Sequence, residues 1–392
     1  MDYKKLLSDK AVNLKPSGIR KFFDVVSEFP DAVSLGVGEP DFVTPYSIRE
    51  AAIRSIQKGY TQYTSNNGLI ELREKNAEYL SVRFNLNYNP QNEIIITIGG
   101  SEAIDIILRA IVDYGDEILI PEPCFVSYAP CVSLCGGVPI SVECFDKDEF
   151  KVTAESLEKK ITKKTKAILL SYPNNPTGAI MEKEHLEKII PVILKHDLFV
   201  ISDEIYAELT YGLEHTSIAS LKGMQERTVL VSGFSKAFAM TGWRVGYICA
   251  PPEIIEHVRK IHQYAIMCAP TMSQYAALAA LKEGLIDNFS VVKEMRDEYN
   301  NRRRFMVKSF NELGLKCFEP KGAFYVFPRV ISTGLNGDEF AENLLKSKKV
   351  AVVPGSAFGE CGKDFVRCSY AYSIKNLDMA VERIAAFLKE RG

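Results

Sequence analysis

The 392-residue sequence predicts an α/β fold, in which a mostly parallel sheet lies between layers of helices and is accompanied by a smaller α+β domain. Between residues 94 and 250, short apolar runs alternate with stretches of helical periodicity, which is typical of parallel strands covered on both faces. The chain is also longer than one hydrophobic core usually serves, so about two domains are expected. We place a large domain at residues 46–285 and a small domain at residues 1–45 and 286–392.

The elements follow in order along the chain. The first forty residues are largely irregular apart from a helix expected near 19–28, and helical spacing then appears at 48–57 and 70–80. The strands expected in the large domain are residues 94–98, 118–120, 138–142, 167–170, 198–202, 228–231 and 245–250. From about residue 276 long helices dominate, including those expected at 287–313 and 377–389. The short strands expected among them are 323–327, 350–353 and 365–371, with few crossover helices, which indicates the α+β domain.

Composition excludes several classes of protein. The chain is 46% hydrophobic and 25% charged, has a net charge of −2 and has no block of basic residues, so nucleic acid and anionic membranes are not expected partners. No apolar stretch approaches the ~18 residues of a membrane span, and no apolar segment follows the basic N-terminal residues, so we expect a cytoplasmic protein. The nine cysteines lack a C-x-x-C pair and the five histidines lack H-E-x-x-H spacing, so no metal is expected.

The stretch 232–247 carries the most specific chemistry. It lies between two apolar runs and contains Lys236 and, eight residues later, Arg244. A lysine on a short turn between buried strands is partly desolvated, which makes an uncharged amine available to bind a carbonyl. The planar fork of Arg244 suits a phosphate. Together they predict a phosphorylated aldehyde cofactor, although a lysine in such a turn is more often a solvated loop residue.

Polar residues also follow other predicted strands, at the edge where parallel sheets bind ligands. Gly100 and Ser101 begin a helix whose N-terminus can bind phosphate, although a plain serine-capped turn would look the same. Asp203 ends a buried strand, where a carboxylate needs a cation such as a protonated ring nitrogen or a structural salt bridge. Tyr206 and Asn175 can donate hydrogen bonds to a phenolate oxygen, or serve as scaffold groups.

Two further side chains fit a bound aromatic cofactor and an acidic substrate. Phe125 could stack on an aromatic ring, although core packing is the more usual fate of a phenylalanine. Arg367 is a charge inside an apolar strand of the small domain. Since arginine is rarely buried unpaired, it indicates a carboxylate, either of a substrate or of the protein.

Taken together, the chain resembles the fold-type I pyridoxal-phosphate aminotransferases of class I and II, from about residue 33 to the C-terminal helix. The motifs that carry the resemblance are YPNNPTG at 172–178, SDEIY at 202–206, SKAFAMTGWRVG at 235–246 and VRCSYA at 366–371. Their order and spacing are far more specific than any one of them. The bacterial subgroup that acts on aspartate, aromatic amino acids or N-acetyl-diaminopimelate is the most similar.

The resemblance implies transamination of an L-amino acid with a 2-oxo acid, expected to be 2-oxoglutarate, with pyridoxal 5′-phosphate as cofactor. Lys236 would bind the cofactor aldehyde and move a proton, Asp203 would keep the pyridine nitrogen protonated, and Phe125 would stack on the ring. Tyr206 and Asn175 would bond the ring oxygen.

The resemblance also implies which residues bind the phosphate of the cofactor and the carboxylate of the substrate. The residues implied for the phosphate are Gly100, Ser101, Arg244, one of Ser232 and Ser235, and Tyr63 reaching across a homodimer with shared active sites. Both serines stay open because Gly233 stands where many relatives have the phosphate serine. Arg367 would grip the substrate α-carboxylate beside Asn175 and the backbone of Gly38. The peptide bond before Pro176 is expected to be cis.

Three alternatives remain open at the level of sequence. Arg20, Lys21 and Arg109 are candidates to read a distal carboxylate, although most such side chains are merely solvated. A carbon–sulfur β-lyase would use the same lysine and cofactor to eliminate a β-substituent. A cofactor-binding regulator would need a DNA-binding module, and no basic helix-turn-helix precedes the domain.

Overall fold

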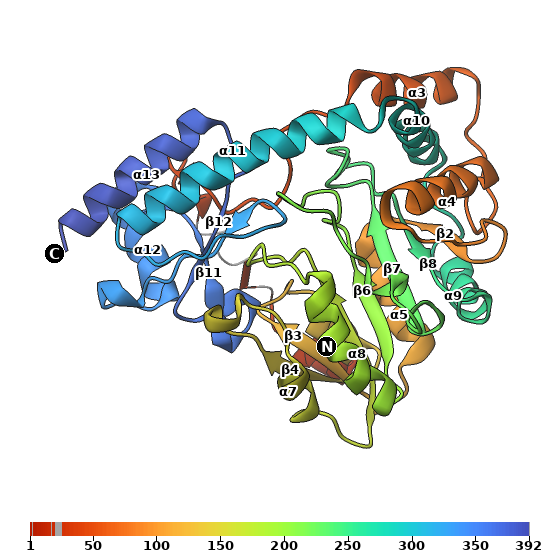
Figure 1. Cartoon of the computed structure of the whole chain (residues 1–392), viewed down its shortest axis with the longest axis horizontal. Helices are drawn as coiled ribbons and strands as arrows, with labels where there is room; N and C mark the ends of the chain where they lie inside the picture. Colours follow the sequence, from red (N-terminus) through yellow and green to blue (C-terminus); the bar gives the residue numbers. More distant parts are fainter. Residues whose placement is uncertain (2, 17, 20–25, 392) are drawn as a thin grey trace.

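A seven-stranded sheet organises the part of the chain that the computed structural model describes, residues 1, 3–16, 18–19 and 26–391 (Figure 1). Its strands are β2 (Ile94–Thr97), β3 (Glu117–Glu122), β4 (Val138–Glu143), β5 (Thr165–Ser171), β6 (Phe199–Asp203), β7 (Thr228–Gly233) and β8 (Gly246–Cys249). They lie in the order β2-β8-β7-β6-β5-β3-β4. β8 is antiparallel to β2 and β7 and every other pair is parallel, which confirms the mostly parallel sheet.

Helices cover both faces of this sheet (Figure 1). Those packed on one face are α5 (Gly99–Ile111), α6 (Tyr128–Leu134) and α9 (Pro252–Ala265). Those on the other face are α3 (Tyr46–Gln57), α4 (Ile70–Phe84), α7 (Ala154–Glu158), α8 (Lys183–Lys195) and α10 (Thr271–Asp287). In β2, Ile95 packs with α5 and α9, whereas Ile94 and Ile96 pack with α3, α4 and α10. Successive side chains of a strand point to opposite faces, so burial on both sides requires the continuous apolar runs of the sequence.

Two smaller sheets lie in the C-terminal part of the chain. β9 (Tyr325–Val326), β12 (Val366–Ser369) and β11 (Val353–Pro354) form an antiparallel sheet, and β1 (Val33–Ser34) pairs in parallel with β10 (Val350–Ala351). The prediction of one strand at 350–353 is therefore wrong, because its two halves pair with different sheets. β1 also falls within the N-terminal stretch that was expected to be irregular.

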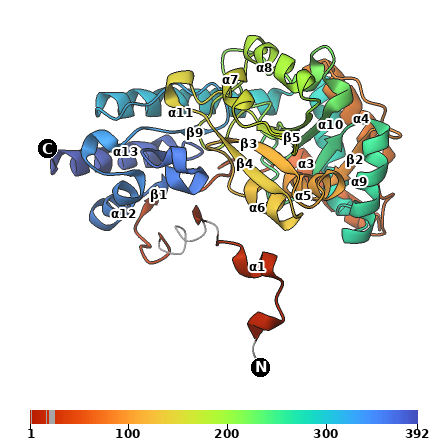
Figure 2. The same ribbon diagram turned by 90° about the horizontal axis from the view of Figure 1, so that it is seen from below.

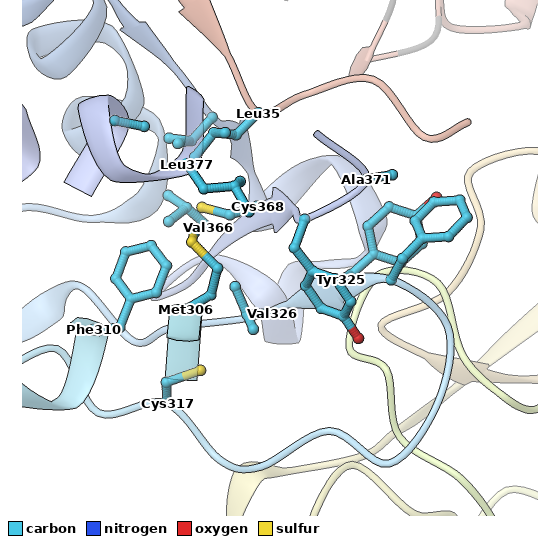
Figure 3. Close-up of a cluster of buried hydrophobic side chains, with 14 of the residues drawn as sticks. Leu35, Met306, Phe310, Cys317, Tyr325, Val326, Val366, Cys368, Ala371 and Leu377 are labelled. Atoms are coloured by element: carbon cyan, nitrogen blue, oxygen red, sulfur yellow. The ribbon is translucent and has the colours of Figure 1, made fainter. Parts of the chain in front are cut away.

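The helices of this part are α11 (Ser290–Glu312), α12 (Gly337–Lys348) and α13 (Ile374–Lys389). Figure 3 shows the core that they share with the small sheets: Met306 and Phe310 of α11 and Leu377 of α13 gather around Val326 and Cys368. The long helix expected at 287–313 is confirmed. It begins at Ser290 because Asn288 and Phe289 adopt left-handed conformations that separate it from α10.

The N-terminal segment, with η1 (Tyr3–Lys5) and α1 (Asp9–Asn13), projects from the rest of the molecule in Figure 2. Lys10 ties it to the C-terminal end of α6 by donating a hydrogen bond to the carbonyl of Leu134, at 3.1 Å. The helix expected near 19–28 falls largely on residues outside the described ones.

The remaining 3-10 helices are η2 (Asp146–Asp148), η3 (Ile218–Ser220), η4 (Gln225–Arg227), η5 (Ile331–Thr333), η6 (Gly355–Phe358) and η7 (Glu360–Gly362). No helix of the described residues is long and apolar enough to cross a membrane. The domain boundaries at 45/46 and 285/286 stay a prediction.

Candidate active site

A cavity of about 620 Å³ lies where residues after β2, β5, β6 and β7 meet the small antiparallel sheet. The predicted site residues that line it are Gly38, Gly100, Ser101, Phe125, Asn175, Asp203, Tyr206, Ser235, Lys236, Arg244 and Arg367. Ser232 and Tyr63 are not among its lining residues. The carboxyl ends of parallel strands therefore gather these groups as expected for such sheets.

Lys236 lies in the turn that joins β7 to β8. Its Nζ atom donates a hydrogen bond to the carbonyl of Gly38, at 2.8 Å, and no carboxylate of the described residues forms an ion pair with it. Loss of water around the amine lowers the pKa of Lys236 to about 8. About a tenth of the side chain is therefore uncharged at pH 7, far more than for an ordinary lysine, and the uncharged amine is the form that can bind an aldehyde.

Asp203 ends β6 and is only 7% exposed. Its Oδ2 atom accepts a hydrogen bond from the hydroxyl of Tyr128, at 2.8 Å, and its Oδ1 atom accepts one from the N–H of Ile205, at 3.1 Å. No cationic side chain of the described residues pairs with it, and burial raises the pKa of Asp203 to about 6. A buried carboxylate in this state favours a cationic ligand.

Arg244 and the start of α5 form an anion-binding corner of the cavity. Nη1 of Arg244 donates to the carbonyl of Thr241, at 2.9 Å, and no carboxylate of the described chain forms an ion pair with this guanidinium. Gly99 opens α5 with a φ of +70°, and a Cβ atom there would lie 2.8 Å from Nη2 of Arg244. A glycine is needed at this close approach, and the free N–H groups of the helix start favour an anion.

Of the two candidate phosphate serines, Ser235 lines the cavity and Ser232 does not. The hydroxyl of Ser232 donates instead to the backbone carbonyl of Glu204, at 3.1 Å. The geometry therefore favours Ser235, together with Ser101 at the first turn of α5.

Arg367 lies on β12 and is 2% exposed. Nη1 donates to Oδ1 of Asn175, at 2.9 Å, and Nη2 donates to the carbonyl of Gly36. Its guanidinium carbon lies 4.6 Å from the ring centroid of Tyr325 and 4.9 Å from that of Phe358. Within the described chain no carboxylate pairs with Arg367 and its buried Nε atom has no hydrogen-bond partner. The protein carboxylate considered from the sequence is thus not found there.

Tyr206 and Phe125, two of the residues expected to contact the cofactor ring, also contact tyrosines that the sequence analysis did not identify. The hydroxyl of Tyr206 lies 2.8 Å from that of Tyr325, and Phe125 packs edge to face on Tyr128, with centroids 5.7 Å apart. The hydrogen-bond partners of Tyr128 and Tyr325 carry no local signal, because Asp203 lies 75 residues from Tyr128 and Tyr206 lies 119 residues from Tyr325. The peptide bond before Pro176 is cis, as expected.

The remaining candidates lie elsewhere. Tyr63 is 78% exposed and away from its own chain's cavity. Arg109 pairs one helical turn away with Asp105, at 2.8 Å, on the surface. Arg20 and Lys21 lie outside the described residues.

The family model "Aminotransferase class I and II" matches residues 30–384. This chain belongs to that family. It is a fold-type I aminotransferase that uses pyridoxal phosphate. It is 54% identical to the Bacillus subtilis protein YugH over 97% of this chain and 98% of that one. It is 47% identical to the aspartate aminotransferase of Pyrococcus abyssi, over 98% and 99% of the two chains. The solved aromatic aminotransferase of Pyrococcus horikoshii superposes with a TM-score of 0.90 at 47% identity, over 94% and 99% of the chains.

The cavity of this aminotransferase fits pyridoxal phosphate. Arg244, which lacks a carboxylate partner, and the open start of α5 suit the phosphate, and the unpaired carboxylate of Asp203 suits a protonated pyridine nitrogen. The amine of Lys236 suits the aldehyde. Each anionic or cationic group of the cofactor thus has a complementary group that is otherwise unpaired.

Proposed function

We propose that the cavity around Lys236 is the active site of this aminotransferase and that its lining residues act in the roles implied by their chemistry. The observation that carries the proposal is the convergence of Lys236, Asp203, Arg244 and Arg367 on one cavity, where none of the four forms an ion pair with another of the described residues. The charges of Asp203 and Arg367 are buried, and a buried charge without an ion-pair partner is costly unless a ligand completes it.

Pyridoxal phosphate supplies an aldehyde that takes up the amino group and a pyridine ring that withdraws electrons from the substrate α-carbon. Lys236 binds that aldehyde when no substrate is present and then carries a proton to and from the α-carbon. Asp203 holds the pyridine nitrogen in its protonated form, and Phe125 packs on the ring. Arg244, Ser101 and Ser235 hold the phosphate.

The substrate is oriented by its carboxylate. Arg367 offers a fork that is already held in place by Asn175 and Gly36, so it binds the α-carboxylate with little loss of conformational freedom. Tyr206 and Asn175 donate hydrogen bonds to the ring oxygen of the cofactor.

We propose aspartate and the aromatic amino acids as the donors to test, since relatives of this chain bear those names, and 2-oxoglutarate as the acceptor. Lys236, Arg244 and Arg367 are the cations of the described cavity lining, and each has a role already. A distal carboxylate would therefore need Arg20, Lys21 or a partner subunit. An aromatic side chain needs no further cation.

We further propose a cytoplasmic homodimer with shared active sites. Tyr63 is 78% exposed, and the preceding helix α3 also carries exposed apolar residues, namely Tyr46, Ile53 and Ile56 at 69%, 54% and 54%. A surface of this kind is typical of a face that another chain covers. The cytoplasmic location rests on the sequence-based expectation.

The proposal is tested by incubating purified holoenzyme with single amino acids and 2-oxoglutarate and quantifying both products. We expect one glutamate for each oxo acid formed. Arg367→Lys should raise the KM for the donor at least tenfold, because a bidentate contact becomes a point contact. Release of ammonia and pyruvate from cystathionine, with no amino transfer, would instead identify the β-lyase.

A further inference from the structure

We propose that Tyr325 is a positioning residue that orients Arg367 through its ring and Tyr206 through its hydroxyl. The inference rests on the proposed function, because it concerns how two residues of that site are held. Tyr206 belongs to the segment after β6, and Tyr325 and Arg367 belong to the small antiparallel sheet. One side chain thus joins the group that faces the cofactor ring to the group that faces the substrate.

Tyr325 is held on several sides. It is fully buried in the protein on β9, where its backbone is paired with Ser369 of β12. A Cβ atom at Gly38 would lie 2.5 Å from its hydroxyl oxygen, and one at Gly178 would lie 2.9 Å from its carbonyl oxygen. The loop of Gly38 therefore closes on the hydroxyl end of the ring and the turn of Gly178 closes on the backbone of Tyr325, which leaves the side chain little room to move.

The ring of Tyr325 contacts the guanidinium of Arg367, with 4.6 Å between the guanidinium carbon and the ring centroid. Phe358 contacts the same guanidinium at 4.9 Å. These contacts attract the cation and restrict the plane of its fork. The hydrogen bonds to Asn175 and Gly36 fix its rotation within that plane. Removing the ring leaves the charge in place but frees its orientation.

The hydroxyl of Tyr325 lies 2.8 Å from that of Tyr206. Tyr206 has one hydroxyl proton, and under the proposed function it donates that proton to the cofactor's ring oxygen, so Tyr325 must be the donor in this pair. Burial raises the pKa of Tyr325, so it keeps its proton. A donor behind Tyr206 strengthens the donation by Tyr206, because hydrogen bonds in a chain polarise one another. The bound cofactor should then release its own proton more readily.

Two substitutions separate the two contacts. Tyr325→Phe keeps the ring and removes the hydroxyl, and Tyr325→Met removes both and leaves a smaller apolar side chain. The matched control is Tyr370→Phe, since Tyr370 is equally buried, donates to the carbonyl of Ala323 and does not line the cavity. The visible absorption spectrum of each holoenzyme is recorded as a function of pH, which gives the pKa of its absorption change. Each holoenzyme is also titrated with succinate or 3-phenylpropionate, whichever perturbs the spectrum of the unmodified enzyme.

For Tyr325→Phe we expect the pKa of the visible absorption change to rise, with carboxylate affinity within about twofold of the unmodified enzyme. For Tyr325→Met we expect the same rise and a carboxylate affinity about tenfold weaker. Tyr370→Phe should change neither. The inference is overturned if Tyr325→Phe behaves as Tyr370→Phe, or if Tyr325→Phe already weakens the carboxylate as much as Tyr325→Met does.

Arg367→Lys separates this inference from the proposed function. If Arg367→Lys leaves carboxylate affinity unchanged, the proposed role of Arg367 fails. If it weakens the affinity while both Tyr325 variants match the control, the positioning inference alone fails.

Discussion

Several charged residues of the cavity form hydrogen bonds with neutral groups alone. Asp203 accepts from a tyrosine and a backbone N–H, Arg244 donates to a carbonyl, and Arg367 donates to an amide and a carbonyl. Neutral partners orient a charge without cancelling it. The charges therefore remain available to a ligand, and the protein alone is less stable because two of them, on Asp203 and Arg367, are buried.

Asp203→Asn should reduce transamination about 150- to 5000-fold, because the loss of one partner of a buried ion pair costs about 3–5 kcal/mol. The same change should stabilise the apoenzyme at neutral pH. The pKa of Asp203 is about 6 in the folded chain and about 4 when unfolded, so folding disfavours the ionised form.

The pH dependence of this effect has a definite sign. The penalty for burying the ionised Asp203 is absent below about pH 4, grows as the pH rises to about 6, and then stays near 3 kcal/mol. Urea unfolding of the two apoproteins at pH 4, 5, 6 and 7 should give free energies of unfolding that diverge in favour of Asp203→Asn. If the difference in free energy of unfolding between the two apoproteins stays constant across this pH range, ionisation of Asp203 carries no penalty in the folded state.

At the scale of single elements, the start of α5 fixes the anion-binding corner. Gly99 allows Arg244 to lie over the first helical turn because it has no Cβ atom and a φ of +70°. Gly115 has a φ of +87° with nothing within 4 Å of a Cβ atom placed there. An alanine at either glycine would strain the backbone, because both have a positive φ. Only at Gly99 would the added Cβ atom also displace the guanidinium of Arg244.

Gly99→Ala should therefore weaken pyridoxal phosphate binding about tenfold relative to Gly115→Ala, because Arg244 must move and lose a charge-assisted contact. Fluorescence titration of the apoproteins with pyridoxal phosphate measures the difference. Equal affinities in the two variants would remove the first turn of α5 from the phosphate site.

The long helix α11 anchors the loop that carries Gly38. Nη1 of Arg302, on α11, lies 2.9 Å from each carboxylate oxygen of Asp41, and its guanidinium lies 5.6 Å from the ring centroids of both Phe42 and Tyr299. Since Gly38 accepts the hydrogen bond of Lys236 three residues earlier, this contact holds one wall of the cavity.

Arg302→Leu should lower the free energy of unfolding by about 2–3 kcal/mol. This is less than for a fully buried ion pair, because the Asp41 side chain is 28% exposed. A double-mutant cycle with Asp41→Asn isolates the contact. Additive losses in urea unfolding, with no coupling between the two changes, would contradict the anchoring role.

How much the sequence could predict depends on how local each feature is. The strands of the seven-stranded sheet, the start of α5 beside Gly100 and the turns of Asn175 and Lys236 were predictable, because each depends on a short run of residues. Tyr325 and its partner Tyr206 are 119 residues apart, so no spacing indicated their contact. The choice of Ser235 over Ser232 likewise depends on which hydroxyl faces the cavity.

At the scale of the whole molecule, the described chain forms most of the proposed site but leaves Tyr63 on its surface. This exposed tyrosine, together with the exposed apolar residues of α3, favours a site that two subunits complete. The proposed homodimer therefore predicts that two inactive variants can restore each other.

Lys236→Ala and Tyr63→Ala should each have little activity at limiting cofactor. When the two are unfolded together and refolded as a mixture, half of the dimers should be mixed, and each mixed dimer has one site with both residues intact. About a quarter of the activity of the unmodified enzyme should return. Activity no higher than the mean of the separate variants would contradict the shared site.

The most direct test of the central claim, that Lys236 and its surrounding cavity bind pyridoxal phosphate and run a half-reaction, is the visible spectrum of the purified holoenzyme. We expect a yellow protein whose visible band disappears on adding a donor amino acid without any oxo acid and returns with 2-oxoglutarate. Lys236→Ala should not give this cycle, whereas Lys260→Ala, on the surface of α9, should behave as the unmodified enzyme. A protein that takes up no pyridoxal phosphate, or whose band no amino acid changes, would contradict the account.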